Sequence, residues 1–116
     1  MVVPSFPKLA QYGAYAPRAV YTPENLSDII RYAYDHGIRV LFELDMPGHS
    51  ASWSKGYPDV CAKCPSFESD VNAIPLSPAV PQTFDLVQGV IQYASSIMMD
   101  QFIHFGGDEL QTGCWK

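Results

Sequence analysis

Two short apolar segments, residues 38–44 and 101–105, each follow directly on a stretch with the apolar spacing of an amphipathic helix. The first reads Ile-Arg-Val-Leu-Phe-Glu-Leu and the second reads Gln-Phe-Ile-His-Phe. Nearly continuous apolar runs of this length are typical of strands buried on both faces of a parallel sheet. The order helix, strand, helix, strand therefore predicts an α/β fold in which helices connect parallel strands.

The two predicted helices have recognisable ends. Thr22 is a suitable N-cap, Pro23 suits the first helical position, and Gly37 suits the position just past the last turn. The second helix is predicted to begin near Pro78 or Pro81 and to continue to about residue 98. The apolar positions of the first helix are Leu26, Ile29, Ile30, Ala33 and Tyr34, and those of the second are Phe84, Leu86, Val87, Val90, Ile91, Ala94, Ile97 and Met98.

The remaining residues are predicted to be loops of one domain, residues 1–116. Residues 1–21 lack periodicity, and residues 45–77 form a connection much longer than most, which is typical of functional loops. A whole (β/α)₈ barrel needs about 200 residues. The 116 residues therefore predict part of a barrel or of a doubly wound sheet, with about two βα units.

Charge and hydropathy exclude several classes of function. The net charge is −5, and the seven Lys and Arg residues form no run, so we expect no nucleic-acid partner. No apolar stretch reaches the roughly 18 residues of a membrane span. The first residues, Met-Val-Val-Pro, have neither the charge nor the apolar run of a signal peptide. Three cysteines cannot form a closed all-disulfide framework.

Polar side chains follow both predicted strands. Asp45 and His49 come after the first strand, and Asp108 and Glu109 come after the second. Any one of them alone is as well explained as a helix cap or a solvated loop residue. Because the ends of neighbouring parallel strands lie about 5 Å apart, the four together predict a site at this edge of the sheet.

Gly106 and Gly107 precede the two acids of the second cluster. Glycine allows strained turns and a close approach of ligand to backbone. The negative charge that follows argues against a phosphate site. Adjacent side chains at a strand end diverge, so Asp108 and Glu109 are not expected to face each other as acid and nucleophile. One of them can donate a proton while the other holds another part of the substrate.

A series of motifs along the chain resembles the catalytic domain of family 20 glycoside hydrolases, the β-N-acetylhexosaminidases, and most closely their eukaryotic lysosomal subunits. In chain order the motifs are Phe6-Pro7-Lys8-Leu9, Tyr21-Thr22, Gly37-Ile38-Arg39-Val40, Glu43-Leu44-Asp45-Met46-Pro47-Gly48-His49, Ser52-Trp53, Tyr57-Pro58, His104-Phe105-Gly106-Gly107-Asp108-Glu109 and Cys114-Trp115. The resemblance implies a partial (β/α)₈ barrel that acts without metal or other cofactor. It also implies glycans ending in N-acetylglucosamine or N-acetylgalactosamine as substrates, a role in glycoconjugate breakdown, a lysosomal or secreted location, and a whole enzyme that can dimerise.

The same resemblance implies roles for individual residues. Glu109 is expected to be the general acid and base, and Asp108 to orient the 2-acetamido group whose oxygen attacks the anomeric carbon. His49 is expected beside the acid, with Asp45 and Gly107 supporting the site. The resemblance also implies a disulfide between Cys64 and Cys114, which leaves Cys61 unpaired.

Alternative interpretations remain at this point. Segments that the family has before and after these motifs are missing from the 116 residues, so we expect an incomplete chain that is inactive alone. A sugar-binding protein without catalysis, derived from the same barrel, is the second hypothesis. A metal-dependent hydrolase using His49, His104, Asp45 and Asp108 is the third, and we expect His104 to be structural. The presence of only three cysteines argues against a zinc site, which needs four ligands. The Cys61–Cys64 pair lies in a long loop and does not open a helix, which argues against a redox site.

Overall fold

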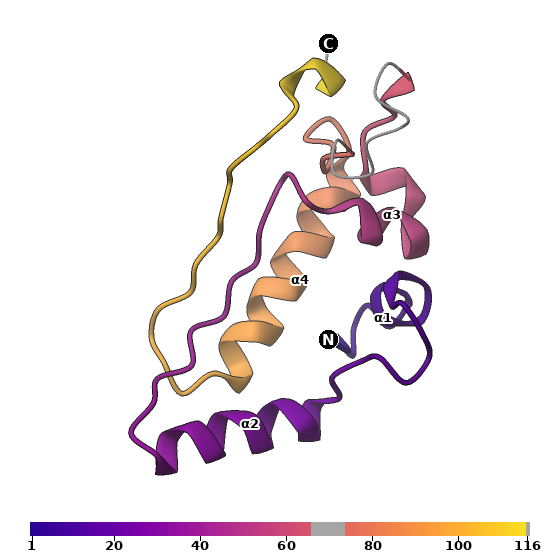
Figure 1. Ribbon diagram of the computed structural model, residues 1–116. Helices are drawn as coiled ribbons and strands as arrows, with labels where there is room; N and C mark the ends of the chain where they lie inside the picture. Colours follow the sequence, from indigo (N-terminus) through magenta and orange to yellow (C-terminus); the bar gives the residue numbers. More distant parts are fainter. Residues whose placement is uncertain (66–73, 116) are drawn as a thin grey trace.

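In a computed structural model of the chain, residues 1–65 and 74–115 are described. Four α-helices lie in this range, with two short 3₁₀ turns among the loops (Figure 1). In chain order the elements are α1 (Lys8–Gly13), α2 (Pro23–Asp35), α3 (Ala51–Gly56), η1 (Pro58–Val60), α4 (Pro81–Ile97) and η4 (Thr112–Trp115). No residue in the described ranges is assigned to a strand longer than an isolated bridge.

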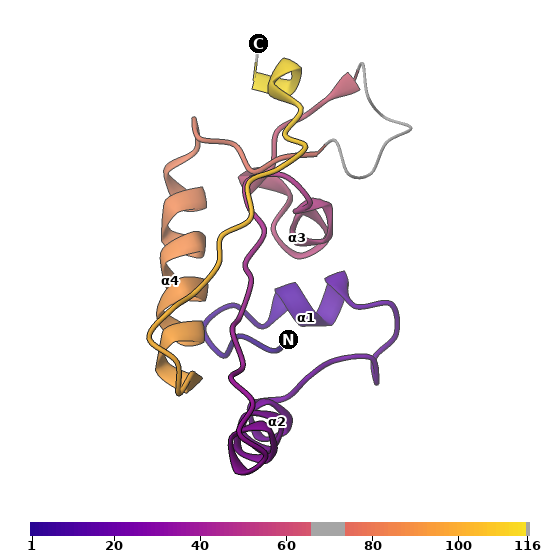
Figure 2. The same cartoon turned by 60° about the vertical axis from the view of Figure 1, so that its left-hand side comes forward.

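The two segments predicted as strands are extended and run side by side in parallel (Figures 1 and 2). Glu43 and His104 form an isolated parallel bridge. The N–H of Leu44 donates to the carbonyl of His104 at 2.8 Å, and the N–H of His104 donates to the carbonyl of Phe42 at 2.9 Å. Their relative direction is therefore the expected one.

Regular strands at 38–44 and 101–105, as predicted, are nevertheless not shown in the described part of the chain, where the two segments share one isolated bridge. An alternating partial (β/α)₈ barrel is thus not what the structure shows. Regular strands do not form here because each segment has only one neighbouring segment to pair with. The described residues provide no third segment to pair with the outer edge of either one, and two extended segments alone are marginally stable as a sheet.

The predicted ends of α2 agree with the structure. The N–H of Asn25 donates to Oγ1 of Thr22 at 3.3 Å, and the N–H of Thr22 donates to Oδ1 of Asn25 at 3.1 Å. This reciprocal capping box fixes the first turn. The helix α4 begins at Pro81, the later of the two predicted positions.

The regions predicted as loops contain short helices. Helix α1 lies within residues 1–21, and α3 and η1 lie within residues 45–77. Helices α1 and α3 pack on each other. Helices of six residues are not stable alone, so tertiary packing rather than a sequence signal forms them.

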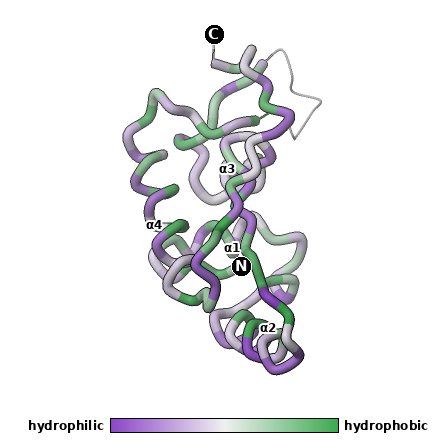
Figure 3. The backbone as a smooth tube through the Cα atoms, turned by 90° about the vertical axis from the view of Figure 1, so that its left-hand side faces the viewer, coloured by the Kyte–Doolittle hydropathy of each residue, from purple (hydrophilic) through white to green (hydrophobic). Residues whose placement is uncertain are grey.

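The core lies along one face of α4. Leu86, Val90 and Ala94 are buried at helical spacing, and Leu44 of the first extended segment packs with Val90 and Ala94. Figure 3 shows hydrophobic and hydrophilic residues alternating along α4, as in an amphipathic helix. A second buried cluster consists of Val60, Cys61, Leu76 and Leu86.

The other side of the paired segments is open. Leu41 and Phe102 are exposed apolar side chains on these segments. The radius of gyration is 15.1 Å, against the roughly 13.4 Å expected for a compact domain of this length. The chain thus forms an open layer: helices cover one side of the paired segments, and polar groups such as Glu43, Asp45 and His104 lie on the other.

An ion pair fixes the two segments at the end away from these polar loops. Nε of Arg39 donates to Oδ2 of Asp100 at 2.6 Å, and Nη2 donates to Oδ1 at 2.9 Å. The Arg39 guanidinium lowers the pKa of Asp100 to about 2. This bidentate pair fixes how far the two segments are shifted along each other, and therefore how the loops that follow them are aligned. Among the described helices, none has the length and apolar character needed to cross a membrane.

Candidate functional site

The four ionisable residues singled out in the sequence meet at the carboxyl ends of the two extended segments. Asp45 and His49 come from the loop after residues 38–44, and Asp108 and Glu109 from the loop after residues 101–105. Side-chain ligand atoms of Asp45, His49 and Asp108 all lie within 4.8 Å of one another. Oε2 of Glu109 lies 3.3 Å from Nε2 of His49. Parallel pairing of the segments brings the clusters together, as the sequence predicts.

His49 lies between two carboxylates. Its Nδ1 is 2.5 Å from Oδ2 of Asp45, and its Nε2 faces Glu109. The hydrogen bond to Asp45 raises the pKa of His49 above its ordinary value of 6.5, although burial opposes the shift and Glu109 and Asp108 add to it. An imidazolium at this position donates from both nitrogens, to Asp45 and to Glu109. The arrangement holds a proton beside Glu109.

Asp45 joins the two loops. Its Oδ2 accepts from His49, while its Oδ1 accepts from the N–H of Gly107 at 3.1 Å, across 62 positions of sequence. The hydrogen bond from His49 and then that from Gly107 hold the pKa of Asp45 below its ordinary value of 3.8. Asp45 is thus placed to orient the imidazole of His49 and the backbone at Gly107 together.

Residues 106–109, here called the acidic turn, have an unusual backbone. Gly106 and Gly107 have φ of +61° and +106°, and Glu109 has φ of +54°. A Cβ on Gly106 would collide with the side chain of Asp45, lying 2.7 Å from its Cγ. Both glycines are therefore required by the conformation. His49 also has a positive φ of 47°. A left-handed non-glycine residue is uncommon, and such residues gather at functional sites.

The Asp45–His49 pair predicts a pH window of stabilisation. The raised pKa of His49 means that its contribution is complete below pH 6.5 and disappears as pH rises through its folded pKa. The lowered pKa of Asp45 means that its contribution is present above pH 3.8 and disappears as pH falls through its folded pKa. We expect Asp45→Asn to lower the urea midpoint most between these two values, 3.8 and 6.5.

The measurement is urea unfolding of wild type and Asp45→Asn from pH 3 to pH 9. Asp59→Asn, on the exposed surface of η1, is the matched control and is expected to show no such window. If the urea midpoints of Asp45→Asn and wild type differ by the same amount across the whole pH range, the pairing of Asp45 with His49 is contradicted.

A disulfide ties the loop after the first segment to the loop after the second. The structure joins Cys64 and Cys114, the pair that the resemblance implies, with their Cα atoms 5.0 Å apart. Beside it, Nε1 of Trp115 donates to the carbonyl of Leu76 at 3.1 Å. Sequence reasoning missed this role of Trp115, because no local pattern indicates its partner. Cys61 is buried and outside the disulfide, and burial raises its pKa to about 11.

Removing the disulfide is expected to lower the free energy of unfolding. The bridge closes a separation of 50 residues, which corresponds to about 4 kcal/mol in the chain-entropy account. Cys114→Ser should therefore lower the denaturant midpoint strongly under oxidising conditions and very little with reductant present. Cys61→Ala, which keeps the disulfide, is the control. Its denaturant midpoint should fall when reductant is added, as that of wild type does. Equal sensitivity of wild type and Cys114→Ser to reductant would show that the bridge does not form.

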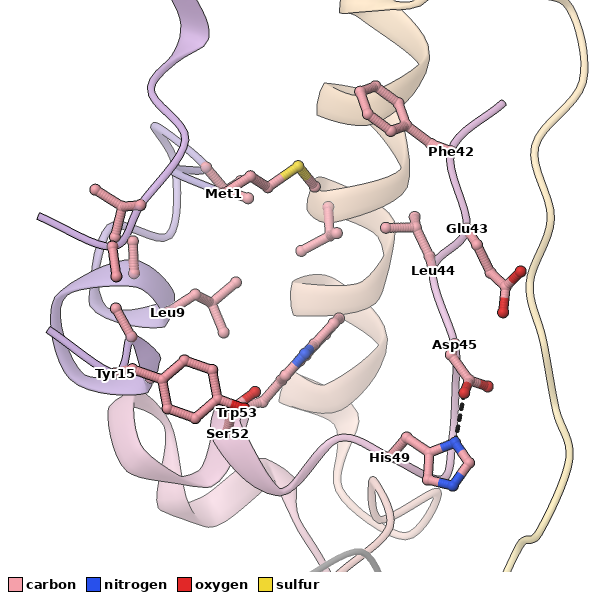
Figure 4. Close-up of a pocket in the computed structure, with 17 residues that line it drawn as sticks. Met1, Leu9, Tyr15, Phe42, Glu43, Leu44, Asp45, His49, Ser52 and Trp53 are labelled. Carbon is pink, nitrogen blue, oxygen red and sulfur yellow. Dashed lines mark hydrogen bonds and ion pairs between the residues drawn. The ribbon is translucent and has the colours of Figure 1, made fainter. Parts of the chain in front are cut away.

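A cavity of about 420 Å³ lies on the helix side of the first extended segment. Figure 4 shows Leu44, Tyr15 and Trp53 around it, whereas the carboxylates of Glu43 and Asp45 point away. The cavity is therefore behind the polar cluster and not the place where the carboxylates could act. The carboxylate side is open, and the side chain of Glu109 is 79% exposed.

Asp45, His49 and Asp108 could in principle hold a cation, because their ligand atoms are close enough. Nδ1 of His49 is already engaged by Asp45. His104, which the metal hypothesis also uses, instead contacts Glu43 and the N–H of Gly106. The four residues of that hypothesis are thus not one ligand set.

Comparisons with known proteins all find the same family of enzymes. The family description "glycosyl hydrolase family 20, catalytic domain" matches residues 1–116. Beta-hexosaminidase subunit A1 of Dictyostelium discoideum is 40% identical over 111 residues, covering 96% of this chain and 21% of that protein. Beta-hexosaminidase subunit beta of Homo sapiens is 39% identical over 113 residues, covering 97% of this chain and 20% of that protein. The chain spans about a fifth of the length of these relatives.

Solved structures are similar over nearly the whole chain. The family 20 β-N-acetylhexosaminidase from Streptomyces coelicolor A3(2) superposes with a TM-score of 0.80 and 28% identity, covering 93% of this chain and 24% of that one. The N-acetyl-β-hexosaminidase of Streptomyces plicatus gives a TM-score of 0.79 and 26% identity, covering 96% and 24% of the two chains. The open layer described above is therefore similar to part of a larger fold.

Proposed function

The chain belongs to glycosyl hydrolase family 20, and on this premise we propose that the protein containing it hydrolyses terminal, non-reducing N-acetyl-β-D-hexosamine residues with retention of configuration. The observation that carries the proposal is the convergence of Asp45, His49, Asp108 and Glu109 at the ends of two parallel segments. The relatives named hexosaminidases support the sugar class. The substrates are glycans that end in N-acetylglucosamine or N-acetylgalactosamine.

We assign Glu109 as general acid and then general base. In the first step its carboxyl group protonates the glycosidic oxygen as the carbonyl oxygen of the 2-acetamido group attacks the anomeric carbon, and the bond to the leaving group breaks. In the second step the Glu109 carboxylate removes a proton from water. That water attacks the anomeric carbon and reopens the cyclic intermediate. His49, whose Nε2 lies 3.3 Å from Oε2 of Glu109, is placed to orient this carboxyl group by donating to Oε2, so that the other oxygen can carry the transferred proton.

We assign Asp108 to the 2-acetamido group. A carboxylate that accepts the amide N–H orients the carbonyl oxygen and stabilises the positive charge that develops on the nitrogen as the ring closes. Asp45 and Gly107 support this arrangement through the hydrogen bond between them. Only one protein carboxylate then has to reach the glycosidic oxygen.

We propose further that residues 1–116 are part of a catalytic (β/α)₈ domain in which the two extended segments are neighbouring strands. Their parallel pairing and the cover of α4 on one side support this placement. In the described residues the site is bounded only by the two extended segments and their loops, and the side chain of Glu109 is exposed. We therefore expect the 116 residues alone to have little or no turnover.

A lysosomal or secreted location fits the disulfide between Cys64 and Cys114, because such bonds persist in oxidising compartments. A role in glycoconjugate breakdown and a dimeric whole enzyme are parts of the same proposal.

The test is hydrolysis of aryl N-acetyl-β-glucosaminide and N-acetyl-β-galactosaminide by the whole protein that contains this chain. The expected first product is the β-anomer of the free sugar, detected by ¹H NMR before mutarotation. An α-anomer would contradict retention. Calorimetric binding of N-acetylglucosamine-thiazoline without any hydrolysis would instead favour a sugar-binding protein derived from the same fold.

A further inference from the structure

We infer that His104 is a positioning residue for the acidic turn, acting through an unprotonated Nδ1 that accepts the N–H of Gly106; this inference rests on the proposed function. Nδ1 of His104 lies 3.1 Å from the nitrogen of Gly106. The acceptor and the donor are two residues apart. This is the geometry of an Asx-turn, with an imidazole in place of an asparagine side chain.

The neighbouring amide is held in the same way. The N–H of Gly107 donates to Oδ1 of Asp45 at 3.1 Å, so consecutive amides of the acidic turn are each bound by a side chain, one from the second segment and one from the loop after the first. Glycine has access to many backbone conformations, and both glycines here have positive φ. Two hydrogen bonds on adjacent amides select one conformation from that range. Asp108 and Glu109 follow directly, so their positions depend on it.

Glu43 competes with Gly106 for Nδ1 of His104, so the protonation of this nitrogen determines which contact forms. Its Oε2 lies 3.1 Å from the same Nδ1 of His104. One ring nitrogen cannot accept from Gly106 and donate to Glu43 at the same time. A proton on Nδ1 would favour the contact with Glu43 and release Gly106. The positioning contact therefore needs the tautomer with its proton on Nε2.

The effect of His104 is not one of burial. Its side chain is 61% exposed, and that of Glu43 is 55% exposed. Replacing His104 therefore removes little apolar packing, and the main loss is an acceptor at one defined point. Asparagine offers an acceptor oxygen at the position of Nδ1, one bond from Cγ. Glutamine carries its acceptor one methylene further out, and leucine has none.

The test compares His104→Asn, His104→Gln and His104→Leu in the whole protein, using kcat and KM for an aryl N-acetyl-β-glucosaminide. Because misplacement of reacting groups by about 1 Å can cost about 100-fold, we expect Gln and Leu to lower kcat about 10- to 100-fold with little change in KM. We expect Asn to restore kcat to within about 3-fold of wild type, since an Asx-turn replaces the lost bond. His36→Leu, at the exposed end of α2, is the matched control.

Each outcome decides the inference. Wild-type kcat in the Gln and Leu variants, or an Asn variant as slow as Leu, would overturn the role of Nδ1 while leaving the proposed function intact. A wild type that hydrolyses neither glycoside would overturn the proposed function and this inference with it. If the Leu variant does not fold, the comparison of the two polar variants, Asn and Gln, still decides.

Discussion

Glu109→Gln is expected to lower kcat/KM about 10²- to 10⁴-fold on substrates whose leaving group is a sugar alcohol, the range that positioned proton transfer contributes. The amide of Gln occupies the place of the carboxyl group but cannot donate the proton that an alkoxide leaving group requires. A 2,4-dinitrophenyl leaving group departs without protonation, so its kcat/KM should fall by less than about 10-fold. Because kcat/KM reports the steps up to the first irreversible one, it isolates the acid role from the later base role.

The measurement is a comparison of kcat/KM for the two leaving groups in the whole protein. Glu24→Gln, the same change in the first turn of α2, is the matched control and should equal wild type on both substrates. Equal losses for the two leaving groups would contradict the assignment of Glu109 as general acid. Unchanged turnover on the sugar leaving group would contradict any catalytic role for this residue.

The meeting of four ionisable groups could be predicted because it depends on topology alone. Once two segments are parallel and adjacent, the loops after them share one edge, whatever their detailed structure. The family resemblance drawn from the motifs is confirmed by the match over residues 1–116. Topology does not determine which atoms touch. The two contacts of Asp45, to His49 and to Gly107, depend on side-chain positions and on a left-handed backbone at His49.

The helices show the same division between local and non-local signals. The ends of α2 could be predicted because Thr22 and Gly37 act on their own neighbours. Helices α1 and α3 could not, because each has six residues and is held by the other. Regular strands are not shown in the described residues, because these two segments pair only with each other and share a single bridge. An apolar run indicates the burial that a segment requires, and the neighbouring segments determine whether it receives that burial.

Asp108→Asn is expected to lower kcat about 10²- to 10³-fold with a smaller change in KM, the cost of losing one electrostatic contact made mainly in the transition state. The ground-state amide N–H binds a neutral acceptor nearly as well as a carboxylate. The carboxylate and the amide differ in effect only as the acetamido oxygen attacks, because the acetamido nitrogen then carries positive charge that Asn cannot neutralise.

Two measurements separate this role from simple sugar binding. N-acetylglucosamine-thiazoline mimics the cyclised intermediate, so Asp108→Asn should weaken its binding far more than that of the product N-acetylglucosamine. Asp28→Asn, on the exposed surface of α2, is the matched control for both ligands. If Asp108→Asn raises KM while kcat stays at the wild-type value, Asp108 binds the sugar without assisting cyclisation. The proximity of Asp108 to Asp45 and His49 would then need a different explanation.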